Sequence, residues 1–368
     1  MSKKVNVLNY IITMAITMGT LFWALMVCND VYGGQMIDAF LRFLVGAIIA
    51  GFLNTTAHEL GHFFAGKRNK FVFSSMVIWF FRWSRVKKKI KFNLVMLGEE
   101  AGYTEMIPTD SESVKKGLKN MTKGGIIASF ILMLIGIPPI FMNFLPVWVY
   151  SIWVMFLPVG AYFFFGSALP QSSYGIMNDG GVLYDLKKDN DRSKVTVSLL
   201  KIQAELFSGK TPSEVDEKLY FDLPQLPEDD PTFAMLLDAR YAYYLDKQDY
   251  ANAKKTTDRL LSLEEYLPKS YNLVIKTNAL YNACTFDFDE QKADDLTYEL
   301  EKYLNNVNTA VNVRTKLAYL INVRRETQSA EVFFKKGYKE ADRCQIKGLG
   351  EYERKLFDRL KLDLNKSE

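Results

Sequence analysis

The sequence predicts an α-helical polytopic membrane protein with about four transmembrane helices and a membrane-associated β segment, followed by an all-α, helical-repeat-like domain. Two observations carry this prediction. Long apolar runs occur in residues 1–190, where 18 Lys and Arg stand against 11 Asp and Glu. Residues 191–368 instead have the helical periodicity of a soluble sequence, with 28 Lys and Arg against 31 Asp and Glu. A chain of 368 residues is long enough for two domains, so we expect a transmembrane domain over 1–190 and a cytosolic domain over 191–368.

Four apolar stretches are long enough to cross a bilayer, which takes about 20 helical residues. They cover approximately residues 5–28, 39–66, 125–146 and 148–168. The first contains no charged residue, and its apolar core is too long for a cleaved signal peptide. We therefore expect it to remain as a membrane helix.

Positively charged residues indicate how the chain is oriented. The loop between the first two spans, residues 29–38, contains acidic residues but no Lys or Arg. The opposite ends of the spans are flanked by Lys3, Lys4, Lys67, Arg68, Lys70, Lys123, Lys187 and Lys188. Because cationic residues are enriched on the cytosolic side, we expect both termini in the cytosol and a multi-pass protein of a cell or inner membrane.

Residues 70–106, between the second and third spans, are expected to form β-strands. β-branched and aromatic residues alternate here around a basic cluster between Arg82 and Lys91, a pattern typical of strands joined by a turn. Unpaired strand edges are not tolerated in lipid, so this segment should lie at the membrane surface or pack against the helices.

The second span contains both histidines of the chain, in NTTAHELGHFFAG, residues 54–66. Residues four apart share one face of a helix, so His58 and His62 can bind one ion while Glu59 lies beside it. His-Glu-x-x-His is the pattern of two zinc ligands and a general base that activates water. The alternative is a pair of helix histidines satisfied by ordinary hydrogen bonds. Polar groups inside a span are costly and usually functional, which favours a metal site.

A hydrolytic zinc site needs a third protein ligand and one open position. Asp179 is the single acidic residue between Gly124 and Tyr184, and it follows the fourth span on the side where the second span ends. We therefore predict that His58, His62 and Asp179 bind one Zn2+ per chain, with Glu59 as the catalytic base. The run from Asn178 to Gly181 is also a turn sequence, and the two interpretations are compatible.

Three further segments accompany the HELGH motif. They are LGEEAGYTEM (97–106), KGGIIASF (123–130) and the Asp-Gly of IMNDGG. Together they resemble the site-2 protease family of intramembrane zinc metalloproteases over residues 39–185. Ile126 and Ser129 replace the Pro and Asn of the family's Gly-Pro-x-x-Asn, Ser167 replaces the Asn of its Asn-x-x-Pro, and Pro170 precedes Asp179 by nine residues. The resemblance implies hydrolysis of a membrane-spanning protein or of a signal or leader peptide.

Four residues are weaker candidates for substrate binding, namely Asn54, Gly102, Tyr103 and Asn178. Asn54 precedes His58 by one turn and either lines a polar cleft or hydrogen-bonds to a neighbouring helix. Gly102 and Tyr103 belong to the glycine-tyrosine stretch of the resemblance. A substrate helix must unwind before hydrolysis, and pairing with an edge of the 70–106 strands would supply it with new hydrogen bonds.

The second half is expected to be helical throughout. Residues 239–268 resemble a tetratricopeptide hairpin, and helices near 269–285, 290–305, 309–326, 328–345 and 349–364 fit continued stacking. A generic helical domain is the alternative, and either would suit a protein or peptide partner. The acidic, proline-bearing residues 222–232 are expected to be a linker into this domain.

Composition argues against a disulfide-stabilised fold and against nucleic-acid binding. The three cysteines are scattered and odd in number, so no disulfide framework is expected. No basic stripe with interleaved aromatic residues occurs, so we expect no nucleic-acid partner. The alternative to a protease is a non-catalytic membrane adaptor that binds a partner through its helical domain.

Overall fold

The computed structural model describes residues 3–33, 36–86, 89–96, 102–142, 144–173 and 176–367. The chain divides into two compact units. The first comprises residues 1–85, 90–107 and 113–193, and the second comprises residues 86–89, 108–112 and 194–368. The division after residue 193 falls inside helix α7 (Asp191–Ser208), just beyond the boundary that the charge pattern places at residue 190.

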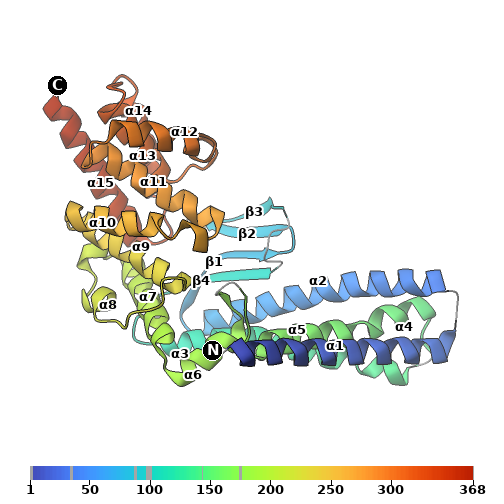
Figure 1. Cartoon of the computed structure of the whole chain (residues 1–368). Coiled ribbons are helices and arrows are strands. Elements are labelled where there is room, and N and C mark those ends of the chain that lie inside the picture. Colours follow the sequence, from blue (N-terminus) through green and yellow to red (C-terminus); the bar gives the residue numbers. More distant parts are fainter. Residues whose placement is uncertain are drawn as a thin grey trace. The chain divides into compact units, whose positions relative to one another are not determined.

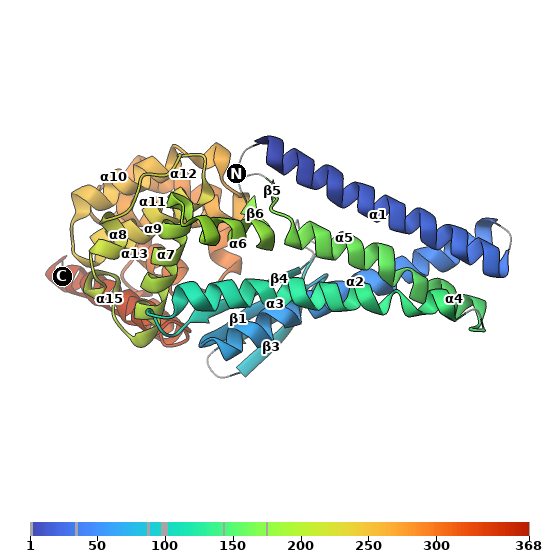
Figure 2. The ribbon, with the colours of Figure 1, turned by 90° about the horizontal axis from the view of Figure 1, so that it is seen from below.

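The first unit is built on long apolar helices that run side by side (Figure 1). They are α1 (Lys3–Tyr32), α2 (Met36–Arg68), α3 (Val114–Ile135), α4 (Val147–Val154) and α5 (Phe156–Ala168). Among the described residues, four stretches are long and apolar enough to cross a membrane: Lys4–Asp30, Asp38–Arg68, Val114–Ile135 and Val147–Ala168. Helix α1 packs along α5 (Figure 2), and α3 packs against both α2 and α5.

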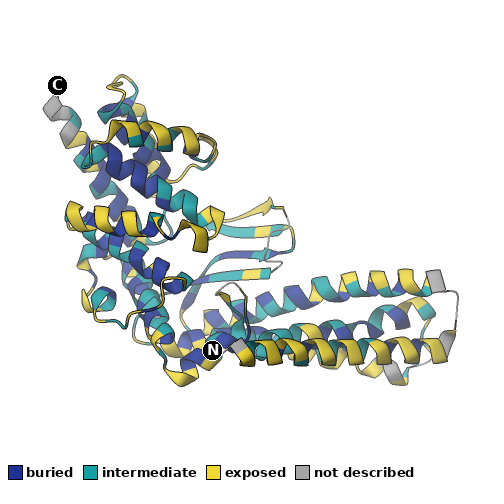
Figure 3. Ribbon diagram, viewed as in Figure 1, coloured by how far each residue is buried: buried dark blue, intermediate teal, exposed yellow. Residues whose placement is uncertain are grey.

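The outer surfaces of these helices are apolar. Large side chains such as Ile11, Phe22, Phe40 and Ile48 are exposed on α1 and α2, where Figure 3 shows exposed residues recurring along the helices. A water-soluble protein rarely exposes so much contiguous apolar surface. The helices therefore have both the length and the surface of membrane-spanning segments.

The third span differs from the expected residues 125–146. Helix α3 begins at Val114 and ends at Ile135, and it is followed by the 3-10 turn η1 (Pro138–Phe141). Pro138 and Pro139 lack the backbone N–H that a continuing helix needs, which explains the early end. The basic residues before Gly124 are good helix formers, so the helix starts earlier than hydropathy alone predicts.

The fourth span is interrupted at Met155, which separates α4 from α5. Pro158 explains the interruption, because it cannot donate a hydrogen bond to the carbonyl of Val154 and its ring crowds the preceding turn. After α5 a short two-stranded hairpin, β5 (Ser172–Ser173) and β6 (Ile176–Met177), leads into α6 (Asp179–Lys188).

The β segment forms a four-stranded sheet in the order β3-β2-β1-β4. The strands are β1 (Phe71–Ile78), β2 (Phe81–Val86), β3 (Lys89–Leu94) and β4 (Gly102–Pro108). β1 and β2 are antiparallel and joined by a tight turn at Trp79, whose φ is 55°. β1 packs beside α2, and β4 is one edge of the sheet. Residues 97–101 of the LGEEAGYTEM stretch lie outside the described residues.

From residue 194 onward, the regular secondary structure described in the second unit is helical. After α7 come η2 (Pro212–Glu214), α8 (Lys218–Phe221), α9 (Pro231–Asp246), α10 (Tyr250–Leu261), η3 (Glu264–Tyr266), α11 (Lys269–Thr285), α12 (Glu290–Asn306), α13 (Ala310–Asn322), α14 (Ala330–Ala341) and α15 (Lys347–Ser367). Helices α9 to α14 pack as three consecutive pairs. Four of these helices, α9, α10, α12 and α13, begin at N-cap residues whose side chains accept a hydrogen bond from a backbone N–H. These residues are Asp230, Asp249, Asp289 and Thr309.

Residues 222–232 are not a linker into this unit, contrary to the sequence expectation. They lie inside it, because Leu226 is buried and packs in one cluster with Val195 of α7 and Phe233 of α9. The acidic and proline residues that mimic a linker form an exposed turn around this buried leucine.

Helix α15 joins the third helix pair to the first. Glu353 of α15 forms a buried ion pair with Arg314 of α13, with 2.8 Å between Oε2 and Nε. Arg359 donates to the backbone carbonyls of Leu245 and Asp246 at the end of α9, each at 2.7 Å. The last helix therefore reaches from the third pair back to the first.

Candidate metal centre

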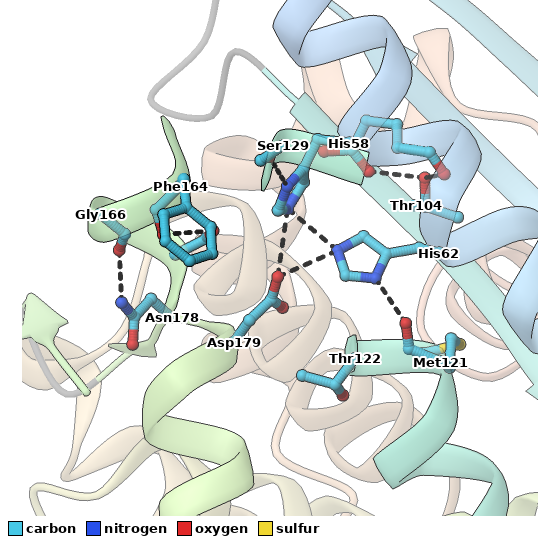
Figure 4. Close-up of polar contacts among 12 residues, drawn as sticks. His58, His62, Thr104, Met121, Thr122, Ser129, Phe164, Gly166, Asn178 and Asp179 are labelled. Atoms are coloured by element: carbon cyan, nitrogen blue, oxygen red, sulfur yellow. Dashed lines mark hydrogen bonds and ion pairs between the residues drawn. The ribbon is translucent and has the colours of Figure 1, made fainter. Parts of the chain in front are cut away.

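Helix α2 places both histidines on one face. His58 and His62 are one turn apart, their rings lie edge to face at 89° with centroids 4.6 Å apart, and their Nε2 atoms are separated by 3.1 Å (Figure 4). The spacing of four residues in an unbroken helix is sufficient to produce this pairing.

Asp179 reaches the same point from the first turn of α6. Its Oδ2 atom lies 3.1 Å from His58 Nε2 and 3.2 Å from His62 Nε2. Within the described part of the chain, these are the three residues whose potential metal-binding atoms converge in this way. The structure thus brings together the three ligands predicted from the sequence.

The triangle of donor atoms fits a small divalent cation. With metal–ligand distances of about 2.0–2.1 Å and tetrahedral angles, donor atoms are about 3.3 Å apart, close to the observed 3.1–3.2 Å. Asp179 Oδ2 is buried, and the polar atoms described beside it are the two imidazole nitrogens. A buried carboxylate oxygen in this position is costly unless a metal cation or a protonated imidazole compensates it.

The charge of Asp179 suits such a role. Burial alone would raise its pKa, but the adjacent imidazoles of His58 and His62 outweigh burial and lower the pKa to about 2. The side chain is therefore an ionised carboxylate, the form that binds metals.

Groups on α3 orient the two imidazoles. His62 Nδ1 lies 2.9 Å from the backbone carbonyl oxygen of Met121, which can only accept, so Nδ1 carries a proton and Nε2 is the nitrogen that faces Asp179. His58 Nδ1 makes a 2.9 Å hydrogen bond with the hydroxyl of Ser129, which is fully buried. Such outer contacts hold ligand nitrogens toward a metal.

Glycines allow α2 and α3 to approach closely enough for these contacts. A Cβ atom on Gly61 would meet the carbonyl of Gly124, and a Cβ on Gly124 would meet that of Gly61. A Cβ on Gly125 would meet both imidazole rings. The site depends on the absence of side chains at this helix crossing.

Glu59 lies outside the triangle and is held by the sheet. Its Oε2 accepts a 2.6 Å hydrogen bond from the Thr104 hydroxyl of β4, and only 5% of the residue is exposed. A Cβ on Gly102, also on β4, would lie 2.6 Å from Glu59 Oε1. One carboxylate is therefore kept beside the imidazoles without joining the converging donors.

The weaker candidates have different surroundings. Asn54 is fully buried and donates to the Ala50 carbonyl at 2.8 Å, while its Oδ1 has no partner. A side chain on Gly102 would meet Glu59, and Tyr103 beside it is exposed. Asn178 caps α6 and uses its amide within the 166–181 segment, donating to Gly166 and Leu169 and accepting from Gln171 and Gly181. This amide positions the chain and is not available to a substrate.

Sequence reasoning missed the residues that support the ligands. No sequence motif marks four of these supporting residues as part of a metal site: Thr104, Met121, Gly125 and Ser129. The available signal was the small-residue spacing of Gly124, Gly125 and Ser129 in KGGIIASF, which indicates a close helix crossing.

His58 and His62 on α2 and Asp179 at the start of α6 thus define a class of site. It is a His-His-Asp triad suited to a divalent cation, beside a separate buried glutamate. Comparisons of the chain with known protein families, curated proteins and solved structures returned no match.

Proposed function

We propose that this chain is an intramembrane zinc metalloprotease that hydrolyses a membrane-spanning protein or a signal or leader peptide. The observation that carries the proposal is the convergence of His58, His62 and Asp179 at 3.1–3.2 Å beside Glu59, on helices with the surface of membrane spans. The sequence resemblance to site-2 proteases points to the same chemistry.

The residues would divide the reaction between them. Zn2+ held by the triad would supply a Lewis acid that polarises a peptide carbonyl and eases the ionisation of water near neutral pH. Glu59 takes the proton from the attacking water and returns it to the leaving nitrogen. The Thr104 hydroxyl, 2.6 Å from Glu59 Oε2, holds the carboxylate in one orientation for both transfers.

The depth of the site favours a substrate within the membrane. His58 precedes Arg68, at the basic end of α2, by ten residues, which corresponds to about 15 Å of helix. The hydrocarbon core is about 30 Å thick. A peptide that reaches the triad must therefore enter the bilayer region, and water must enter with it.

The sheet is proposed to lie at the membrane and to hold the substrate. Phe52 of α2 packs edge-on against Trp79 and Phe81, with ring centroids 5.5 and 6.3 Å apart, which joins the sheet to an apolar helix surface. β4 is an edge strand, and its Thr104 contacts Glu59. An extended substrate paired along β4 would pass beside the catalytic glutamate and gain partners for its backbone.

The second unit is proposed to be a cytosolic, tetratricopeptide-like module that binds a protein or peptide partner. Its three stacked helix pairs support this assignment. Both termini are then cytosolic, with the basic ends of α2 and α3 on the same side of a cell or inner membrane.

The first experiment is zinc content per chain in detergent-purified protein, comparing wild type with His58→Ala and Asp179→Ala. One zinc in the wild type, lost or sharply weakened in both variants, is the expected result. Glu59→Gln should keep zinc and lose hydrolysis. Hydrolysis retained by Glu59→Gln would refute the catalytic proposal.

A non-catalytic adaptor is the second candidate. The observations that favour it are the departures from the family pattern at Ile126, Ser129, Ser167 and Pro170. It predicts that a partner binds the second unit and that the wild type takes up no zinc, which the same measurement distinguishes.

A further inference from the structure

A polar stripe lies on one face of α1, inside an otherwise apolar span. Asn6, Asn9 and Thr13 are spaced by three and four residues, so they share a face of the helix. Asn9 and Thr13 are buried at 8% and 3% exposure. Polar side chains in a membrane helix are costly unless they have hydrogen-bond partners, so we identified the partners of this stripe.

The stripe binds the backbone of the segment that follows α5. Asn6 Nδ2 donates to the Ser172 carbonyl at 2.9 Å, and Asn6 Oδ1 accepts from the Ser172 N–H at 2.9 Å. Asn9 Nδ2 donates to the Pro170 carbonyl at 2.6 Å. Helix α1 therefore fixes the backbone path of residues 170–172 through both amide side chains.

Gln171 joins this stripe to the next part of the chain. Its side chain is 6% exposed and donates to the Thr13 hydroxyl at 2.8 Å and to the Asn9 carbonyl at 3.3 Å. Its backbone N–H donates to Asn178 Oδ1 at 2.9 Å, and its carbonyl accepts from the Asn178 N–H at 3.1 Å. One residue thus contacts α1 with its side chain and Asn178 with its backbone.

Asn178 passes this constraint to the metal ligand. It caps α6, whose first residue is Asp179. The only regular structure described between α5 and α6 is the hairpin of β5 and β6, each two residues long. A hairpin this short is not stable by itself, so the turn that carries Asp179 needs external support.

We infer that α1 positions the third metal ligand, with Gln171 as the positioning residue between the Asn9 and Thr13 stripe and Asp179. The inference rests on the proposed metal site. The alternative is a purely structural role, in which these hydrogen bonds only attach α1 to α5. That alternative predicts lower stability in variants of the stripe but an unchanged metal geometry.

Matched variants separate the two explanations. Thr13→Val removes the hydroxyl that Gln171 contacts, and Thr13→Ser restores it. Thr20→Val makes the same change further along α1, where the hydroxyl bonds to carbonyls of its own helix, those of Ile16 and Thr17. Gln171→Leu removes the side-chain contacts and keeps the backbone.

The measurement is zinc affinity of the full-length protein in detergent, by competition with a chromophoric chelator, together with the visible spectrum of the cobalt(II)-loaded protein. Contacts around metal ligands typically change affinity by about 10–100-fold. For this more distant contact we expect about tenfold weaker binding in Gln171→Leu and about threefold in Thr13→Val, with altered cobalt bands. Thr13→Ser and Thr20→Val should match the wild type.

Wild-type affinity and cobalt bands in folded Thr13→Val and Gln171→Leu would overturn the inference and leave the proposed function intact. If Gln171→Leu does not fold, the Thr13 and Thr20 pair decides alone. A wild-type protein that takes up no metal would overturn both the inference and the proposed metal site.

Discussion

Replacing Gly125 by alanine tests the geometry of the metal centre with a single methyl group. The added Cβ would lie 2.5 Å from Cε1 of His62 and 2.9 Å from Cε1 of His58. Carbon atoms in unstrained contact are about 3.5–4.0 Å apart, so the His62 ring must withdraw by about 1 Å.

The expected loss of affinity follows from that displacement. Metal–ligand distances tolerate deviations of about 0.2 Å, so the ring would move several times beyond tolerance. Altering the hydrogen-bond partners of a ligand already weakens binding by about 10–100-fold. Displacing the ligand itself should cost at least about 100-fold, or about 2.8 kcal/mol.

The assay is chelator competition for zinc in detergent, with circular dichroism to establish that the variant is folded. Gly19→Ala on α1 is the matched control, because a Cβ there has nothing within 4 Å and should leave zinc affinity unchanged. Wild-type affinity in folded Gly125→Ala would refute the packing of the two imidazoles against α3, and with it the triad geometry.

Three further predictions concern catalysis and stability. Thr104→Val should lower hydrolysis about tenfold without changing zinc content, because a hydrogen bond to the Glu59 carboxylate is lost; equal rates would show that this hydroxyl does not orient the base. Proline scanning of residues 103–105 should block hydrolysis and retain zinc, and unchanged hydrolysis would count against pairing along β4. Arg314→Met should lower the free energy of unfolding of the second unit by about 3–5 kcal/mol, because the Glu353 carboxylate is left buried without its partner. The Arg314→Met, Glu353→Leu double variant should recover most of that loss in chemical denaturation, and a double variant as unstable as the single one would contradict this reasoning.

Local sequence signals anticipated several elements. The four-residue spacing of His58 and His62 produces their pairing within any unbroken helix. Asp179 stood out because apolar spans contain few acidic residues. In the second unit, the expected 269–285 and 290–305 agree closely with α11 and α12, which follow from helical periodicity. Pro268 precedes the first of these helices, and the Asp289 side chain caps the second.

Two kinds of feature could not be predicted from local sequence. The first is the extent of the third span: hydropathy alone placed its start about ten residues too late, because the basic first turns of α3 extend beyond the apolar stretch. The second is any feature that depends on contacts between distant residues. The strand order β3-β2-β1-β4 and the contact of Thr104 with Glu59 join residues far apart in the chain. The polar stripe of α1 was likewise not recognised from the sequence, because its partners at 170–172 lie far along the chain.

The cost of the triad itself bears on the choice between a protease and an adaptor. Two imidazole nitrogens and a carboxylate oxygen lie within 3.2 Å of one another, and the carboxylate oxygen is buried. Groups of this kind destabilise a fold unless a metal cation or a bound proton compensates them. A pure adaptor would gain stability from apolar residues at all three positions. The Ser129 hydroxyl and the Met121 carbonyl of α3 hold the two imidazoles in place, and we take this support as favouring the proposed metal over a bound proton, a choice that the zinc measurement decides.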